Sequence, residues 1–179
     1  RENASYWVNQ SKAWMSYGLT ERGQVDLDAS YKLKRYDKRT FSDLGDEDRL
    51  LVNGAFRHRM APDFHGFLFA GYDQPSFQNG VRGDYRGYLG GVGLERQFND
   101  QWKGSIALGY EFLDYQDAAE HDTSLPYVKA AAQARPGARL TVDAEAEYSL
   151  EPSDRSLYSS KEYLRLLMRG TLALSESLS

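Results

Sequence analysis

The segment Arg139-Leu-Thr-Val-Asp-Ala-Glu-Ala-Glu-Tyr-Ser-Leu-Glu151 decides the fold class. From Leu140 to Leu150 every second residue is apolar or aromatic, and the residues between them are polar. Because successive side chains of a β-strand point to opposite faces, this segment forms a strand with one apolar and one polar face. Helical spacing does not fit it.

The same alternation recurs along the chain. It is regular over Gly23–Tyr36 and Gln101–Tyr115, where apolar side chains alternate with charged or small ones. Less regular strands are predicted at residues 10–19, 48–60, 64–74, 84–98, 124–135 and 162–174. We therefore predict an all-β protein of about nine antiparallel, up-and-down strands.

The connections between these strands alternate between short and long. The short turns are predicted at residues 20–23, 61–63, 99–100 and 135–138. The long polar loops are predicted at residues 37–47, 75–83, 116–123 and 152–161. Outer-membrane barrels alternate in this way, with periplasmic turns and longer extracellular loops. We predict one domain over residues 1–179, a transmembrane β-barrel or a barrel segment.

The direction of the strands indicates a segment of a larger barrel. If the short turns are periplasmic, the first strand runs towards the periplasm, and the strand number is odd. Whole bacterial barrels have even strand numbers. We therefore expect further strands, at least one of them upstream.

Composition narrows the class of protein. The net charge of -4 argues against a nucleic-acid partner, and the absence of cysteine excludes disulfides and thiolate sites. No window approaches the about 18 apolar residues of a membrane-spanning helix. The alternative is a soluble β-sandwich or lipocalin-like barrel, but strands of about 10–14 residues exceed the usual length of about 5–6 in soluble sheets.

The polar faces of the predicted strands carry charges of both signs. The predicted lumen-lining residues are Asp26, Asp28, Lys32, Lys34, Arg57, Arg59, Lys103, Glu111, Lys129, Asp143, Glu145, Glu147, Arg165 and Arg169. They either brace a wet interior or line a pathway for a polar or ionic solute. Mixed signs predict no strong ion selectivity.

Aromatic residues gather near predicted strand ends, as in the interfacial girdles of barrels. We predict Tyr36, Phe98, Trp102 and Tyr115 as girdle residues. For other aromatics, such as Tyr88 or Tyr163, the alternative is a sugar-stacking platform in the lumen.

No enzyme, metal or cofactor is predicted. The glycine-rich run at Tyr88–Leu94 lacks the Gly-Lys-Ser/Thr of a phosphate loop, and no serine–histidine triad stands out. His58 and His65 flank a turn and face each other across a hairpin in one interpretation, but without a third ligand. The acidic loop Asp37–Asp48 is either a solvated loop or a weak Ca²⁺ and lipopolysaccharide contact.

The segments Ala29–Asp37, Asp48–Phe56 and Trp102–Tyr115 resemble bacterial outer-membrane barrels of the β-barrel porin type 2 group. The resemblance implies an outer-membrane location and a role in exopolysaccharide export, and it carries over no catalytic residue.

We therefore expect a channel or export barrel in the bacterial outer membrane that passes a polar solute such as a polysaccharide. Its expected partners are membrane lipid, lipopolysaccharide and periplasmic export proteins. The alternatives are a non-transporting structural or adhesive barrel that binds a partner through its loops, and a soluble β-sheet binding domain.

Overall fold

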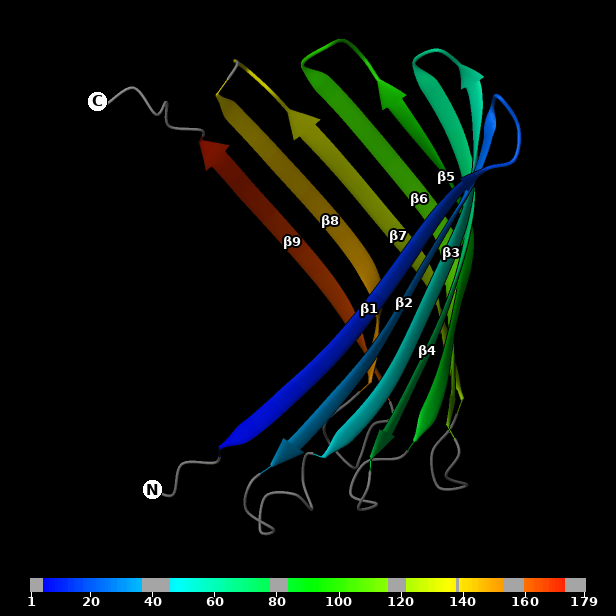
Figure 1. Cartoon of the computed structure of the whole chain (residues 1–179), viewed down its shortest axis with the longest axis vertical. Helices are drawn as coiled ribbons and strands as arrows, with labels where there is room; N and C mark the ends of the chain where they lie inside the picture. The colour runs from blue at the N-terminus through cyan, green and yellow to red at the C-terminus, as the bar shows by residue number, and fades with distance from the viewer. Residues whose placement is uncertain are drawn as a thin grey trace.

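The computed structural model describes residues 5–36, 46–77, 84–115, 122–137, 139–152 and 160–172, which form one antiparallel sheet (Figure 1). Its strands are β1 (Tyr6–Gly18), β2 (Gly23–Tyr36), β3 (Glu47–Ala61), β4 (Phe64–Phe77), β5 (Tyr85–Gln97), β6 (Trp102–Tyr115), β7 (Thr123–Ala134), β8 (Leu140–Pro152) and β9 (Ser160–Leu172). Each strand pairs with its neighbours in sequence. The predicted all-β, up-and-down arrangement of nine strands is confirmed.

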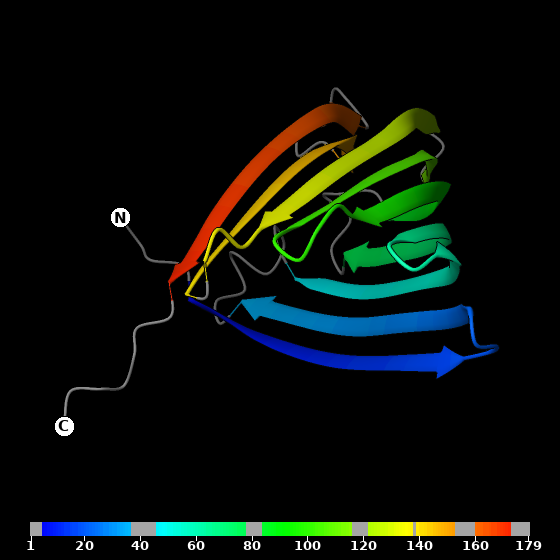
Figure 2. The same cartoon turned by 90° about the horizontal axis from the view of Figure 1, so that it is seen from above.

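The sheet is curved but open. β1 and β9 form its two edges, and the strand order contains no pairing between them. Figure 2 shows the nine strands as an arc with a hollow on one side. The predicted closure into a barrel is therefore not shown. No helix in the described part of the chain is long and apolar enough to span a bilayer.

Several strands extend beyond their predicted ends. β1 begins at Tyr6, where the Tyr6 and Tyr36 rings lie 5.4 Å apart and the Lys34 ammonium lies over both. Glu47 begins β3 opposite Phe77, the last residue of β4, so the ladder enters two of the predicted loops. The remainder of the long loops lies mostly outside the described residues.

The short connections are closed by local hydrogen bonds. The Leu19 amide donates to the Gly23 carbonyl at 2.8 Å in the β1–β2 turn. In the β5–β6 turn, the Trp102 amide donates to the Asn99 side-chain oxygen at 2.8 Å. These turns lie at one end of the sheet, the upper end in Figure 1.

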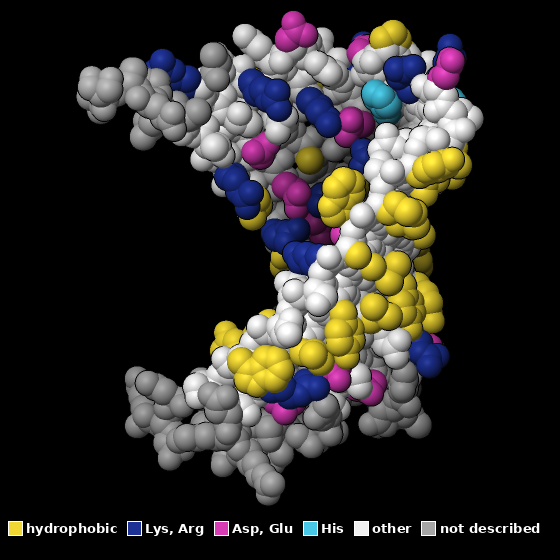
Figure 3. Space-filling model, in the orientation of Figure 1, with side chains coloured by type: hydrophobic (Ala, Val, Ile, Leu, Met, Phe, Trp, Pro, Cys, Tyr) yellow, Lys and Arg dark blue, Asp and Glu magenta, His cyan; other side chains and the backbone are white. Residues whose placement is uncertain are grey.

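The strand register places apolar side chains in continuous rows across the sheet. One row passes through all nine strands: Tyr17, Val25, Phe56, Leu68, Val92, Leu108, Val128, Tyr148 and Leu164. These side chains are not packed away from solvent, since Leu68 and Val92 are 56% and 55% exposed. Figure 3 shows the hydrophobic side chains along the outer, convex side of the sheet.

The opposite, concave face is polar and more sheltered. Charged side chains gather in its hollow (Figure 3). The described buried cluster also lies on this face, with Tyr85, Leu113 and Tyr115 packed together and Leu125 against them. A soluble sheet buries its apolar face and exposes its polar one. This sheet does the reverse.

Glycines on β5 and β6 let the concave face hold two phenylalanine rings. A methyl group at Gly93 would lie 2.1 Å from the ring of Phe67. A methyl group at Gly91 would lie 2.3 Å from the Leu108 carbonyl oxygen and 2.6 Å from the Phe69 ring. Only glycine permits this close approach. The glycine-rich run therefore shapes the sheet.

We predict that Gly91→Ala lowers the free energy of unfolding by about 1–3 kcal/mol, because the added methyl group meets backbone that cannot move freely. The neighbouring Gly90→Ala is the matched control, since its methyl group would meet nothing closer than 3.9 Å. Urea unfolding followed by circular dichroism measures both. Equal stability of the two variants would contradict the proposed crowding.

Candidate functional site: the charged concave face

A chain of ion pairs crosses the concave face from β2 to β6. Arg57 on β3 contacts Asp26 on β2 at 2.8 Å and Glu95 on β5 at 3.7 Å. Lys103 on β6 contacts the same Glu95 at 3.0 Å. The Arg57 guanidinium also lies 5.7 Å from the centroid of the Phe67 ring on the intervening strand β4. The Arg57–Glu95 pair thus links two strands that are not direct neighbours, β3 and β5.

A second cluster joins β7, β8 and β9. Lys129 lies 3.1 Å from Glu145 and 3.4 Å from Glu147, and Arg165 lies 2.9 Å from each of them. Glu147 stands directly opposite Arg165 in the β8–β9 ladder. Each carboxylate is therefore shared between two cations. Asp143 accepts a hydrogen bond from the Gln133 amide at 2.8 Å.

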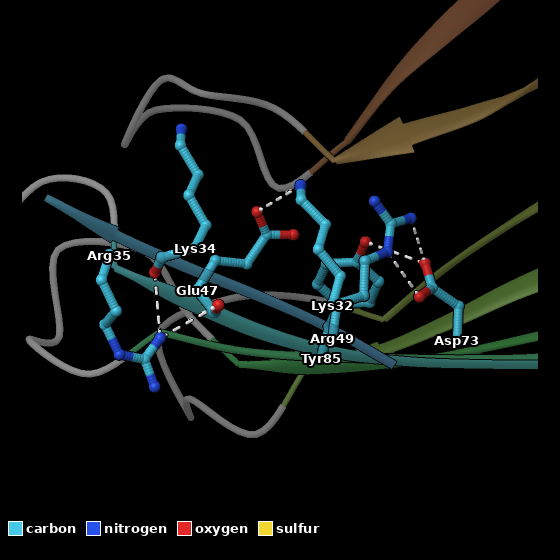
Figure 4. A network of polar contacts seen from close by, with 7 residues as sticks. All are labelled: Lys32, Lys34, Arg35, Glu47, Arg49, Asp73 and Tyr85. Carbon is cyan, nitrogen blue, oxygen red and sulfur yellow. Dashed lines mark hydrogen bonds and ion pairs between the residues drawn. The ribbon is translucent and has the colours of Figure 1, made fainter. Parts of the chain in front are cut away.

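A third cluster lies towards the opposite end of the sheet from the short turns (Figure 4). Arg49 binds Asp73 through two hydrogen bonds of 2.7 and 2.5 Å, and the Tyr85 hydroxyl donates to the same carboxylate at 3.3 Å. Lys32 pairs with Glu47 at 3.1 Å. The bidentate Arg49–Asp73 pair is the geometry in which a guanidinium binds a carboxylate most strongly.

Figure 4 also shows a contact that comes from the other face. Arg35 donates from Nη1 to the backbone carbonyls of Lys34 at 2.9 Å and Glu47 at 3.2 Å. Since these two carbonyls belong to β2 and β3, the contact ties the ends of the two strands together.

All fourteen predicted lumen residues lie on the concave face by strand register. The structure brings eight of them into the ion pairs described above: Asp26, Lys32, Arg57, Lys103, Lys129, Glu145, Glu147 and Arg165. Arg59 instead donates to the Glu21 carbonyl at 3.1 Å in the adjacent turn. Asp28, Glu111 and Arg169 share the face. Whether the face lines a lumen stays a prediction.

Sequence reasoning missed Arg49, Asp73 and Glu95. Arg49 lies an even number of residues from Arg57 on β3, so strand alternation alone puts both on the same face. Glu95 likewise lies an even number of residues from Tyr85 on β5, so the two share a face. Strand alternation in the sequence was therefore enough to place Arg49 and Glu95 on their faces.

The predicted girdle residues separate onto two faces. Phe98 and Trp102 lie on the convex side at the β5–β6 turn, 64% and 50% exposed. Tyr36 and Tyr115 instead lie on the concave face, where Tyr115 is 9% exposed and its ring is 5.7 Å from that of Tyr85. A one-residue change of position moves a side chain to the opposite face of a strand. The girdle prediction is wrong for these two.

A row of aromatic residues that was not predicted as a girdle occupies the convex face at the end of the sheet far from the short turns. The Tyr72 and Tyr88 rings lie 5.4 Å apart, and those of Tyr88 and Phe112 lie 6.4 Å apart. Tyr88 therefore points away from the hollow, so it is not a sugar-stacking platform on the concave face.

The two groups of aromatic residues on the convex face are separated by the length of the apolar surface. Along β6, about ten residues separate Trp102 from Phe112, or about 33 Å of strand. At the tilt of about 40° usual in barrels, this spans roughly 25 Å, the height of the apolar band of an outer-membrane barrel.

No metal cluster is found among the residues that the structure describes. His58 pairs with Gly66 and His65 with Arg59, so the two histidines lie on opposite faces of the sheet. The idea that they face each other across the hairpin is wrong. Most of the acidic loop at 37–48 lies outside the described residues, and its interpretation as a cation contact stays a prediction.

Comparison with known proteins yields one informative likeness. No family model matches the chain, and no curated protein matches it. Among solved structures, the chain is similar to a bacterial polysaccharide outer membrane secretin, with a TM-score of 0.64 over 95% of this chain. The two share a fold. At 10% identity the likeness shows the fold alone, and the chain spans 58% of that neighbour's length. The resemblance to porin type 2 barrels stays a prediction.

We predict that Arg57→Gln lowers the free energy of unfolding by about 0.5–1 kcal/mol at low salt, because Arg57 is partly exposed and its ion pairs are screened by solvent. The loss shrinks at 1 M NaCl, where the wild-type pairs are themselves screened. Urea unfolding at both salt concentrations measures this. Lys12→Gln on β1 is the control, since no ion pair of Lys12 occurs among the described residues. A salt-independent loss would contradict the electrostatic origin.

Proposed function

We propose that this chain is part of the wall of an outer-membrane channel that exports a polysaccharide or another polar solute. The proposal depends mainly on one observation, the apolar row that crosses the convex face of all nine strands while the charged residues occupy the hollow. Lipid on one side and water on the other would satisfy both faces.

A soluble protein is a poorer fit to this surface. Soluble monomers rarely expose continuous apolar patches larger than a few hundred Å². Here Leu108 and Leu164 in the row are 51% and 67% exposed, and the row extends from edge to edge of the sheet. The two aromatic rows at the ends of the apolar surface support the same conclusion, since aromatic side chains favour the membrane–water interface.

A membrane location requires that the sheet be closed. Unpaired backbone groups on β1 and β9 would each cost several kcal/mol in hydrocarbon, because lipid offers no hydrogen-bond partner. We propose that further strands complete the wall. The similar secretin supports this, since this chain corresponds to 58% of it.

The concave face suits a hydrated path for a polar solute. Its cations and anions are largely paired with one another, so it presents no ring of a single sign. The name of the similar protein, a polysaccharide secretin of the outer membrane, agrees with a sugar polymer as cargo. In this proposal the chain is not an enzyme. Membrane lipid and lipopolysaccharide surround it, and periplasmic export proteins deliver the cargo.

We predict that Leu108→Arg destabilises the protein in lipid vesicles by about 2–4 kcal/mol, the cost of an arginine near the bilayer midplane on the lipid face of a barrel. Ser105→Arg on the same strand is the control, because it lies on the concave face opposite Glu95. Urea unfolding of the full-length protein in vesicles compares the two. Equal costs, or folding without any lipid or detergent, would contradict the membrane assignment.

We predict that the full-length protein conducts ions in planar bilayers with weak ion selectivity. The double variant E145K and E147K should shift the reversal potential in a salt gradient towards anions, because it reverses two carboxylates on the concave face. A matched change at Glu162, which lies on the opposite face of β9 from Arg165, should leave the potential unchanged. Absence of any stable channel would overturn the export proposal.

A further inference from the structure

Trp14 on β1 is the one of the three tryptophans that lies on the concave face. It stands directly opposite Asp28, and its side chain is 80% exposed. The other aromatics at the centre of this face are packed: Phe67 and Phe69 lie over glycines, and Tyr127 is buried with its ring 5.8 Å from that of Phe69. All of edge strand β1 is exposed, so the exposure of Trp14 does not mark a site by itself. What distinguishes Trp14 is the position of an indole on the polar face of the sheet.

The indole borders a shallow hollow in the concave face. The hollow has a volume of about 490 Å³, within the range of about 300–1,000 Å³ that is common for small-molecule sites. Trp14 and Phe69 are among the residues that line it, and so are the small residues Ala55 and Gly71. In the ladder Ala55 stands opposite Phe69 and Gly71 opposite Asn53, so small side chains on β3 and β4 leave space on the face beyond the indole.

Polar groups are placed around the same hollow. Asp26 is already held by the Gln24 amide at 2.7 Å and by Arg57 at 2.8 Å. Asp28, by contrast, has no hydrogen bond or ion pair to another residue in the described part of the chain. The Asn53 side-chain oxygen lies over Gly71, where a methyl group would be 2.9 Å from it. A carboxylate and a carboxamide thus remain available beside an exposed aromatic face.

We propose that Trp14, Asp28 and Asn53 form a saccharide-binding subsite. The apolar face of one pyranose unit stacks on the indole, and its hydroxyl groups donate to Asp28 and exchange hydrogen bonds with Asn53. An aromatic face and a few polar groups that fix orientation are the usual composition of a ligand site. The carboxylates favour neutral or amino sugars over uronic acids. This inference rests on the proposed function, because it assigns a binding position to the exported polymer.

The test is calorimetric titration of the detergent-solubilised full-length protein with three hexasaccharides. They are N-acetylglucosamine hexamer, its cationic de-N-acetylated form, and anionic galacturonic acid hexamer. We expect the wild type to bind the first two more tightly than the third. Trp14→Ala should weaken that binding by about tenfold, as expected for loss of a tryptophan anchor. Trp14→Phe should weaken it less, and Asp28→Asn should reduce the preference for the first two hexamers over the anionic one.

Trp7→Ala is the matched control, because Trp7 lies on the same strand but on the convex face. It should bind the hexamers as the wild type does. Heat-modifiable gel migration verifies that each variant is folded. Wild-type affinity in Trp14→Ala, or tighter binding of the anionic hexamer, would overturn the subsite even if the protein conducts ions. Trp14-dependent binding by a protein that forms no channel would support the subsite and overturn the proposed export function instead.

Discussion

The register between neighbouring strands is the constraint on which the other features of this sheet depend. It aligns Val92 with Leu68 on one side and with Leu108 on the other, and the same alignment continues to both edges. A slip of one residue in any pairing would transfer a whole strand's apolar side chains into the hollow and its charges onto the convex face. One set of pairings therefore fixes both surfaces at once.

The charged side chains of the concave face reinforce that register. Arg57 reaches across β4 to Glu95, and Arg165 shares two carboxylates with Lys129 across β8. A single partly exposed ion pair contributes little to stability, but these pairs form networks that join the strands on either side of β4 and of β8. Bracing the strands and lining a path for a polar solute are thus compatible roles, because the same charged groups can do both.

Much of this could be predicted from alternation alone. The segment Arg139–Glu151 gives both the strand and its two faces, and the fourteen charged residues fall on the expected face. Prediction failed where alternation was not applied. Tyr115 was predicted as a girdle residue because it ends its strand, although counting from Glu111 puts it on the charged face. Arg49 and Asp73 were missed although both lie within predicted strands. Closure could not be predicted, since it depends on what pairs with β1 and β9.

The arrangement of aromatics on the concave face agrees with the demands of transport. A solute that must move on has to bind strongly enough to enter and weakly enough to leave. Phe67 and Phe69 are pressed against glycines and leave a smooth wall, whereas Trp14 projects from it beside one carboxylate that has no described partner. A deep, fully enclosed pocket would trap a sugar unit. In the proposed export path, a single indole in an open hollow would hold a sugar unit only briefly, and such brief contacts by successive units of a polymer would favour passage over retention.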